Sequence, residues 1–157
     1  MTRNRSLTFL AGAAVMALVA LAVAGCGGGT GGSATVGVAT TGLGKTLVDS
    51  TGRTLYVFQK DPGTKSACAG ACTTDWPPLR ASGKPTVGSG VNRALVAMTT
   101  RSDGAPQVTY NGHPLYRYEG DAKPGDSAGQ GVMAFGAPWY ALDPAGNHNK
   151  AGGGSGY

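Results

Sequence analysis

The sequence has few charged residues and few histidines, and these shortages exclude several classes of function. Charged side chains make up 13% of the chain, about half of the usual share of roughly a quarter. The basic residues are scattered and the net charge is +5, so the sequence lacks the basic stripe that is typical of nucleic-acid binding. We expect a mildly basic surface and no nucleic-acid partner.

Catalytic and metal-binding patterns are also missing. The two histidines are His113 and His148, whereas zinc and copper sites usually combine several histidine, cysteine or carboxylate ligands. No phosphate-binding loop of the Gly-x-x-x-x-Gly-Lys-Ser/Thr type occurs. No nucleophile, histidine and acid can be assigned to one catalytic set. The sequence therefore predicts no enzyme, no catalytic residue, no metal and no cofactor.

The chain begins with the pattern of an export signal. Residues 1–6 carry two arginines and no acid, residues 7–23 are uncharged and mostly apolar, and small residues precede Cys26. This order is that of a signal peptide, and with a cysteine after the cut it resembles the bacterial lipobox. We expect residues 1–25 to be removed and Cys26 to receive acyl chains. The alternative is an uncleaved membrane span, which needs about 17–25 apolar residues.

Lipid on Cys26 would hold the protein on the outer leaflet of the cell membrane, or on the outer membrane of a diderm host. Two acyl chains anchor a protein stably, whereas one chain does so only marginally. Residues 26–35 are rich in glycine and are expected to form a flexible tether. Residues 144–157 are expected to form a flexible tail.

Two cysteines remain once Cys26 is assigned to lipid. Cys68 and Cys72 form an even pair, and in an oxidising compartment we expect them to form a disulfide. A redox-active dithiol is a second interpretation, although redox pairs usually have two intervening residues. A metal site is a third, although two thiols alone make an incomplete ligand shell.

The rest of the chain contains an internal duplication. Residues 47–61 align without a gap with residues 107–121, so that Leu55-Tyr56 matches Leu115-Tyr116. The two copies extend over about residues 36–80 and 94–143, and together they form a repeat domain at 36–143. Trp76 and Trp139 occupy comparable places in the two copies.

Each copy is expected to contain a β-hairpin. Asn111-Gly112 lies between two short apolar runs, which is the strongest local hairpin signal, and no segment after residue 34 keeps a helical period. We predict a small all-β domain with little helix, made of two antiparallel units in a sandwich-like or open-barrel arrangement. Strand alternation places Tyr56 and Phe58 on a buried face and Leu55 and Val57 on a face that is at least partly wet.

The aspartates that follow the two predicted strands allow two interpretations. Asp61 and Asp121 precede segments that contain proline and glycine, and a carboxylate there can accept backbone N–H bonds and stabilise a turn. If the packing of the repeats brought them together, they could instead form a paired-carboxylate site.

Each copy also contains the pattern Tyr, any residue, aromatic, any two residues, Asp. Its residues are Tyr56, Phe58 and Asp61 in the first copy and Tyr116, Tyr118 and Asp121 in the second. With the lipobox, the cysteine pair and the Trp76-Pro-Pro-Leu segment, this pattern resembles the bacterial lipoproteins with the Yx(F/W/Y)xxD motif, the family of secreted repeats of unknown function. The resemblance implies an extracytoplasmic, non-enzymatic protein. It supplies no catalytic residue.

Two classes of function therefore remain. The first is a membrane-anchored, non-catalytic protein that binds an envelope protein or ligand through loops around Trp76, Trp139 and Tyr140. The second is a redox or electron-transfer accessory that uses Cys68 and Cys72 or a bound cofactor. The first predicts a colourless protein whose disulfide resists mild reductant, and the second predicts a visible absorption band or a reduction potential near that of thioredoxin.

Overall fold

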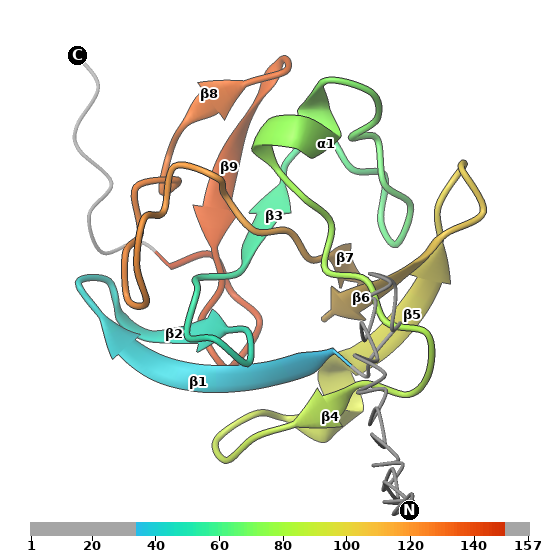
Figure 1. Ribbon diagram of the computed structural model, residues 1–157. Helices are drawn as coiled ribbons and strands as arrows, with labels where there is room; N and C mark the ends of the chain where they lie inside the picture. The colour runs from blue at the N-terminus through green and yellow to red at the C-terminus, as the bar shows by residue number, and fades with distance from the viewer. Residues whose placement is uncertain (1–33, 150–157) are drawn as a thin grey trace, which may run out of the picture.

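A computed structural model of the protein describes residues 34–149 (Figure 1). The expected signal peptide, Cys26, residues 27–33 of the tether and residues 150–157 lie outside the described residues. The strands are β1 (Thr35–Thr41), β2 (Gly44–Val48), β3 (Tyr56–Phe58), β4 (Thr86–Val87), β5 (Val96–Thr100), β6 (Pro106–Tyr110), β7 (His113–Pro114), β8 (Met133–Ala134) and β9 (Ala137–Ala141). The helical segments are α1 (Cys72–Asp75) and a 3-10 turn, η1 (Arg93–Leu95).

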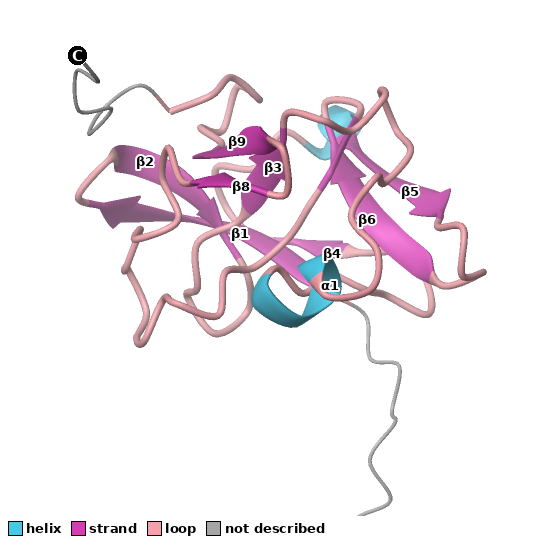
Figure 2. Ribbon diagram, turned by 90° about the horizontal axis from the view of Figure 1, so that it is seen from above, coloured by secondary structure: helices cyan, strands magenta, loops and turns pink. Residues whose placement is uncertain are grey.

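The strands form three small sheets, with the orders β2-β1-β4, β3-β9-β8 and β5-β6-β7. All pairings are antiparallel except the short one between β1 and β4. The β5-β6 ladder lies on the right in both ribbon views (Figures 1 and 2). The prediction of a small all-β domain with little helix is confirmed. No helix within residues 34–149 is both long and apolar enough to cross a membrane.

β3 of the first repeat pairs with β9 of the second, and an isolated antiparallel bridge joins Tyr56 to Tyr116. The Tyr56 N–H donates to the Tyr116 carbonyl at 2.8 Å, and the Tyr116 N–H donates to the Tyr56 carbonyl at 2.9 Å. Equivalent residues of the two copies therefore bond to each other, as they do across a twofold axis. The motif tyrosines lie at the centre of the domain.

Backbone bonds around the first hairpin correct the gapless alignment of the copies. The Leu55 N–H donates to the Leu47 carbonyl, and the Leu115 N–H donates to the Val108 carbonyl, each at 2.9 Å. Val108 is therefore the structural counterpart of Leu47, not of Val48. The first copy has one extra residue in its turn, because Asp49 accepts side-chain and backbone bonds that widen the loop around Thr51.

Both faces of β3 are buried, so the expectation that the leucine face is partly wet is wrong. Leu55, Val57 and Leu115 are fully buried in one cluster that also contains residues of β1, β2 and β6. The aromatic face forms a second cluster with the cysteines and tryptophans. Alternation along one strand could not show this, because the covering layer on the leucine side comes from other sheets.

The folded part continues past residue 143. His148 forms an isolated bridge with Leu142, and the Asn149 N–H donates to the Ala141 carbonyl at 2.7 Å. Asn149 is 9% exposed. The segment from Asp143 to Asn149 thus returns along the end of β9.

Candidate functional site

The motif tyrosines and aspartates pair between the repeats rather than within them. The Tyr56 hydroxyl donates to Asp121 Oδ2, and the Tyr116 hydroxyl donates to Asp61 Oδ2, both at 2.8 Å. Each copy therefore supplies a donor to the other copy and receives one from it. The motif thus joins the two copies, because each tyrosine hydroxyl bonds to the aspartate of the other copy.

The second oxygen of each aspartate holds the loop that follows it. Asp61 Oδ1 accepts from the Ala67 N–H at 2.7 Å, and Asp121 Oδ1 accepts from the Ala128 N–H at 2.9 Å. The interpretation of these residues as turn-stabilising carboxylates is confirmed by these bonds. Each carboxylate belongs to its own hydrogen-bonded group, so the structure gives no support to a paired-carboxylate site.

Burial sets the protonation behaviour of these groups. It raises the pKa of Asp61 to about 6, although bonds from Ala67 and Tyr116 and the charge of Arg101 act in the opposite direction. Burial also raises the pKa of Asp121. The pKa values of Tyr56 and Tyr116 rise because both hydroxyls are buried beside a carboxylate, so the tyrosines act as hydrogen-bond donors.

Four aromatic rings form a continuous stack through the centre of the second cluster. Phe58 stacks on Trp139 with centroids 4.1 Å apart, Trp139 stacks on Trp76 at 4.0 Å, and Trp76 stacks on Tyr118 at 4.2 Å. The third motif position of each copy thus covers the tryptophan of the other copy. Trp76 and Trp139 are 1% and 0% exposed, so their rings belong to the core, and ligand binding by the loops around them stays a prediction.

The disulfide between Cys68 and Cys72 is present, with Cα atoms 5.3 Å apart. Both cysteines are buried. Arg101, whose side chain is 2% exposed, donates from Nη2 to the Cys68 carbonyl at 2.6 Å and from Nη1 to Ser66 Oγ at 2.7 Å. A buried arginine from the second repeat therefore fastens the disulfide loop of the first. Nothing in the sequence around Arg101 indicates this role.

Tyr140, the third aromatic residue predicted to take part in binding, lies outside the stack of four rings. Tyr140 is half-buried and stacks on His148 at 5.2 Å, and His113 lies 6.3 Å from His148. The two histidines thus approach each other. Within residues 34–149, however, no group of three or more His, Cys, Asp or Glu side chains could hold a metal ion.

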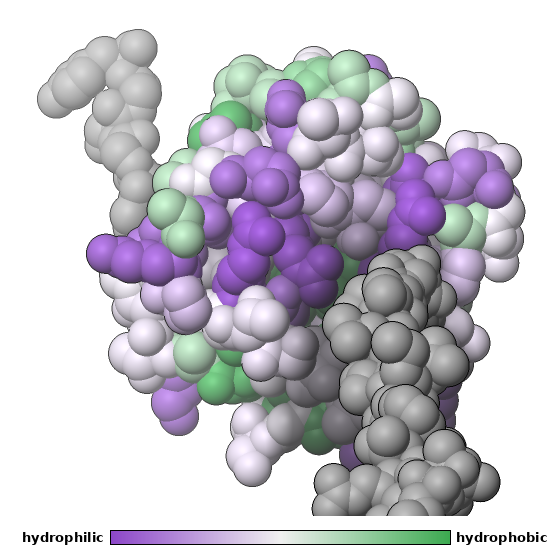
Figure 3. Space-filling view, in the orientation of Figure 1, coloured by the Kyte–Doolittle hydropathy of each residue, from purple (hydrophilic) through white to green (hydrophobic). Residues whose placement is uncertain are grey.

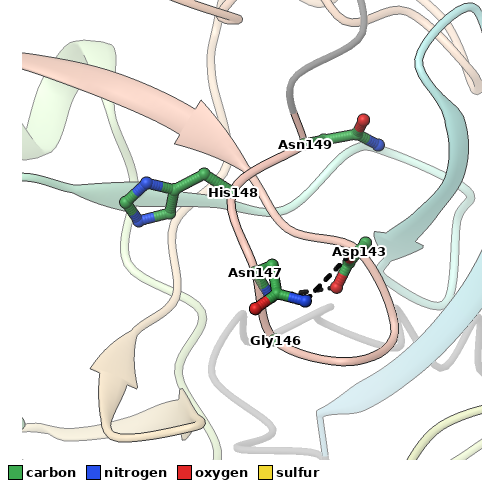
Figure 4. A pocket seen from close by; sticks show the side chains of 5 residues that line it. All are labelled: Asp143, Gly146, Asn147, His148 and Asn149. Atoms are coloured by element: carbon green, nitrogen blue, oxygen red, sulfur yellow. Dashed lines mark hydrogen bonds between the residues drawn. The ribbon is translucent and has the colours of Figure 1, made fainter.

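A cavity of about 610 Å³ lies beside this region. Its lining residues are Asp143, Gly146, Asn147, His148 and Asn149 (Figure 4). Asp143 Oδ2 accepts from Asn147 Nδ2 at 3.3 Å, while His148 and Asn149 point in opposite directions. Asp143 is used within the loop, whereas His148 bonds to Gln59 and Asn149 bonds to Thr46, so the polar side chains that line the cavity have protein partners.

Three large apolar side chains within residues 34–149 are exposed: Met98 in β5, Met133 in β8 and Phe135 in the turn between β8 and β9. Met133 is 70% exposed and Phe135 is 39% exposed. The φ angle of Phe135 is 55°, a left-handed conformation that bulky residues rarely adopt. This turn was not predicted from the sequence, although the apolar run Val-Met-Ala-Phe-Gly-Ala-Pro at residues 132–138 could have indicated it.

Comparison with known proteins agrees with the duplication. A family model described as "secreted repeat of unknown function" matches residues 37–80 and again residues 97–143, and the two matches cover more than half of the chain. The chain belongs to this family of secreted repeats, and an extracytoplasmic location follows from the description. No curated protein and no solved structure matches the chain.

Proposed function

For this member of the secreted-repeat family, we propose a role as a lipid-anchored, non-catalytic binding module of the cell envelope. Acyl chains on Cys26 hold the protein at the membrane, and the Gly-rich segment before Ala34 separates the anchor from the folded domain. The order of basic, apolar and small residues before Cys26 supports the anchor.

A single contrast carries the binding role. The chemistry-bearing side chains at the centre of the domain already have internal partners, since Asp61 and Asp121 each accept a tyrosine hydroxyl and a backbone N–H. Of the three exposed large apolar side chains within residues 34–149, Met98 lies on β5, whereas Met133 in β8 and Phe135 in the turn after it lie two residues apart. Exposed apolar residues that gather at one place mark an interaction site.

The redox alternative receives less support. Cys68 and Cys72 are both buried. Arg101 holds the disulfide loop in place through its hydrogen bond to the Cys68 carbonyl. Redox-active disulfides are typically exposed or strained, so that a thiolate can attack a sulfur. A cysteine pair that is buried and fastened in this way suits a structural role.

The anchor is tested with Cys26→Ala and with the double variant Cys68→Ser/Cys72→Ser as the matched control. Cys26→Ala should abolish acyl labelling, whereas the control should keep full labelling because its lipidated cysteine is intact. Mass spectrometry of the N-terminal peptide reads the acyl chains directly. Labelling that persists in Cys26→Ala would refute the anchor.

The non-catalytic, non-redox role is tested on the purified mature protein. We expect no visible absorption band, no stoichiometric metal, and a disulfide that stays closed in a glutathione buffer poised at the potential of the thioredoxin couple, about −270 mV. Reduction of the Cys68–Cys72 bond under these native conditions would favour the redox accessory instead.

A further inference from the structure

Two turns of the domain have the same backbone geometry and very different residues. Asn111-Gly112, between β6 and β7, has φ angles of 49° and 79°, and Phe135-Gly136, between β8 and β9, has φ angles of 55° and 90°. Both are two-residue turns with positive φ at both positions, for which Asn-Gly is the favoured sequence. Phenylalanine is an unfavourable residue at the first position, so stability of the turn does not explain it.

The same phenylalanine is also partly exposed to water. Phe135 is 39% exposed and Met133, two residues earlier, is 70% exposed. Figure 3 shows apolar surface at the top of the molecule, where β8 lies in Figure 1. Strained backbone and an exposed aromatic side chain are two separate costs at one residue, and such costs concentrate at functional sites.

We propose that the β8–β9 turn inserts Phe135 and Met133 into the interfacial layer of the same bilayer that holds the lipid anchor. This inference rests on the proposed anchoring at Cys26, and it identifies the binding partner of the apolar turn as the phospholipid surface. The turn then makes a second contact with the membrane and sets the orientation of the domain on it.

The size and shape of the turn favour a bilayer over a protein. A stable protein interface buries at least about 1,000 Å² of surface with good complementarity. Phe135 in the two-residue turn and Met133 in the preceding strand offer only a small, protruding contact. A bilayer needs no complementary surface, because apolar side chains enter it one by one. Lipid on Cys26 also keeps the turn at a high effective concentration near the membrane, so a weak insertion is sufficient.

Charge and backbone bonding fit the same partner. No acidic residue lies between Asp126 and Asp143, so the turn carries no negative charge into an anionic surface. Lys60 is exposed, and its Nζ donates to the Phe135 carbonyl at 3.3 Å. This ammonium lies where anionic headgroups would meet it, and it partly satisfies a carbonyl that would otherwise lose its water on insertion.

The length of chain before the domain permits the contact. In Figure 1 the β8–β9 turn lies at the top and β1, the first strand, lies at the bottom, so the domain must tilt for the turn to reach the bilayer. The chain from Cys26 to Ala34 can extend to about 26–29 Å. A domain of this size has a radius of gyration of about 13 Å. The reach of this segment is therefore about twice the radius of gyration, and the proposal requires the domain to lie on its side rather than upright.

The contact is tested with the lipidated, full mature chain reconstituted in vesicles of phosphatidylcholine and phosphatidylglycerol. Phe135→Trp and Met133→Trp each place a tryptophan on the turn, and Ser89→Trp, in the exposed segment after β4, is the matched control. With brominated lipids, emission from the turn tryptophans should be quenched at least twofold more than emission from the control. Circular dichroism verifies that each variant keeps the native fold.

Quenching of Phe135→Trp and Met133→Trp that does not exceed that of Ser89→Trp would overturn the proposal. So would protection of the turn tryptophans in native membranes but not in vesicles, because that outcome indicates a protein partner. Deletion of residues 29–33 leaves a reach of about 10 Å, and it should abolish the quenching while the anchor is retained. If quenching persists after the deletion, the tilted arrangement is wrong.

The two proposals fail separately in this design. The mass of the N-terminal peptide reports acylation of Cys26 whatever the turn does. If Cys26 carries no acyl chain, the proposed anchor is refuted. Insertion of the turn into the bilayer that holds this anchor is then refuted as well. If Cys26 is acylated and the turn tryptophans are not quenched, only the insertion of the turn is refuted.

Discussion

The two repeats share one core and differ in the segments that follow their motif aspartates. In the shared part, Tyr56 and Tyr116 exchange hydroxyl bonds with Asp121 and Asp61. After Asp61 the first repeat closes a short disulfide loop. After Asp121 the second repeat forms a longer loop and the exposed β8–β9 turn. The duplicated residues therefore build the scaffold, whereas the hairpin of β8 and β9 belongs to the second repeat alone.

The largest expected effect tests the equivalence of the two halves of the core. Trp76→Ala and Trp139→Ala each remove a fully stacked ring from the same column, and each should lower the free energy of unfolding by about 3–5 kcal/mol. Urea denaturation of the purified protein measures both values. A difference between them that exceeds about 2 kcal/mol would break the comparison, because the pseudo-twofold core would then depend on one repeat.

The disulfide is the clearest asymmetry between the repeats. Cys68→Ser/Cys72→Ser should destabilise the protein by about 2 kcal/mol, because closing a loop this short removes less chain entropy than closing a 15-residue loop, which contributes roughly 3 kcal/mol. Thermal and urea unfolding give the change. An unfolded variant would show that the first repeat relies on its covalent bond far more than the second relies on its hairpin.

The exchanged tyrosine bonds make a prediction about coupling. Tyr116→Phe should cost about 1–3 kcal/mol, because it leaves the partly buried carboxylate of Asp61 with one bond fewer. A double-mutant cycle with Asp61→Asn should give a coupling energy near about 1 kcal/mol, and the matched cycle with Asp121→Asn should give almost none. Equal coupling in both cycles would contradict the pairing between repeats.

Asp61 makes stability depend on pH in a defined direction. Burial raises its pKa in the folded state to about 6 from 3.8, so the folded protein binds more protons than the unfolded chain between these values. Stability should therefore fall as pH rises from about 4 to 6 and then level off. A shift of two pKa units corresponds to about 2.7 kcal/mol, and partial exposure of Asp61 reduces the expected change to about 1 kcal/mol.

Thermal unfolding between pH 4 and pH 7 measures this effect, and Asp61→Asn should flatten most of it. Asp121 acts in the same direction, because burial raises its pKa as well. Asp49 differs: burial opposes the change, but bonds from Thr51 and Arg117 lower its pKa overall, so its contribution is lost only at more acidic pH. A wild-type protein that gains stability from pH 4 to pH 6 would contradict the assignment to Asp61.

The smallest expected change in stability concerns the first residue of the two turns, Asn111 and Phe135. Phe135→Asn replaces a residue that is strained at positive φ with one that tolerates it, as Asn111 does in the other turn. We expect stability to rise by about 0.5–1 kcal/mol. A loss of stability would mean that the phenylalanine ring stabilises the fold itself, and its place in the turn would then need no external partner.

Much of the fold followed from local signals in the chain. Asn111-Gly112 indicated a hairpin because both positions tolerate positive φ, and the structure has a turn there. Cys68 and Cys72 were the pair left after Cys26 was assigned to lipid, and they are joined. The duplication was visible because Leu55-Tyr56 and Leu115-Tyr116 stand at equivalent places. Each of these features depends on residues that are close in sequence or on direct repetition.

The candidate site was less accessible to the same reasoning. Strand alternation correctly placed Tyr56 and Phe58 in a core, but it left Leu55 and Val57 partly wet, because one strand does not show which sheet will cover its other face. The role of Arg101 in holding the disulfide loop could not be predicted, since the Cys68 carbonyl and the Ser66 hydroxyl that it binds lie more than thirty residues away in the sequence.

The sequence by itself determined the strand-rich class, the duplication, the cysteine pair and the aspartates at the turns, because local turn chemistry and two-residue alternation act over a few residues. Only the tertiary structure decided that Tyr56 bonds to Asp121, that Tyr116 bonds to Asp61, and that Trp76 stacks on Trp139. These contacts require two equivalent copies packed about a common axis. The order of residues along the chain does not show which copy will complete the motif of the other.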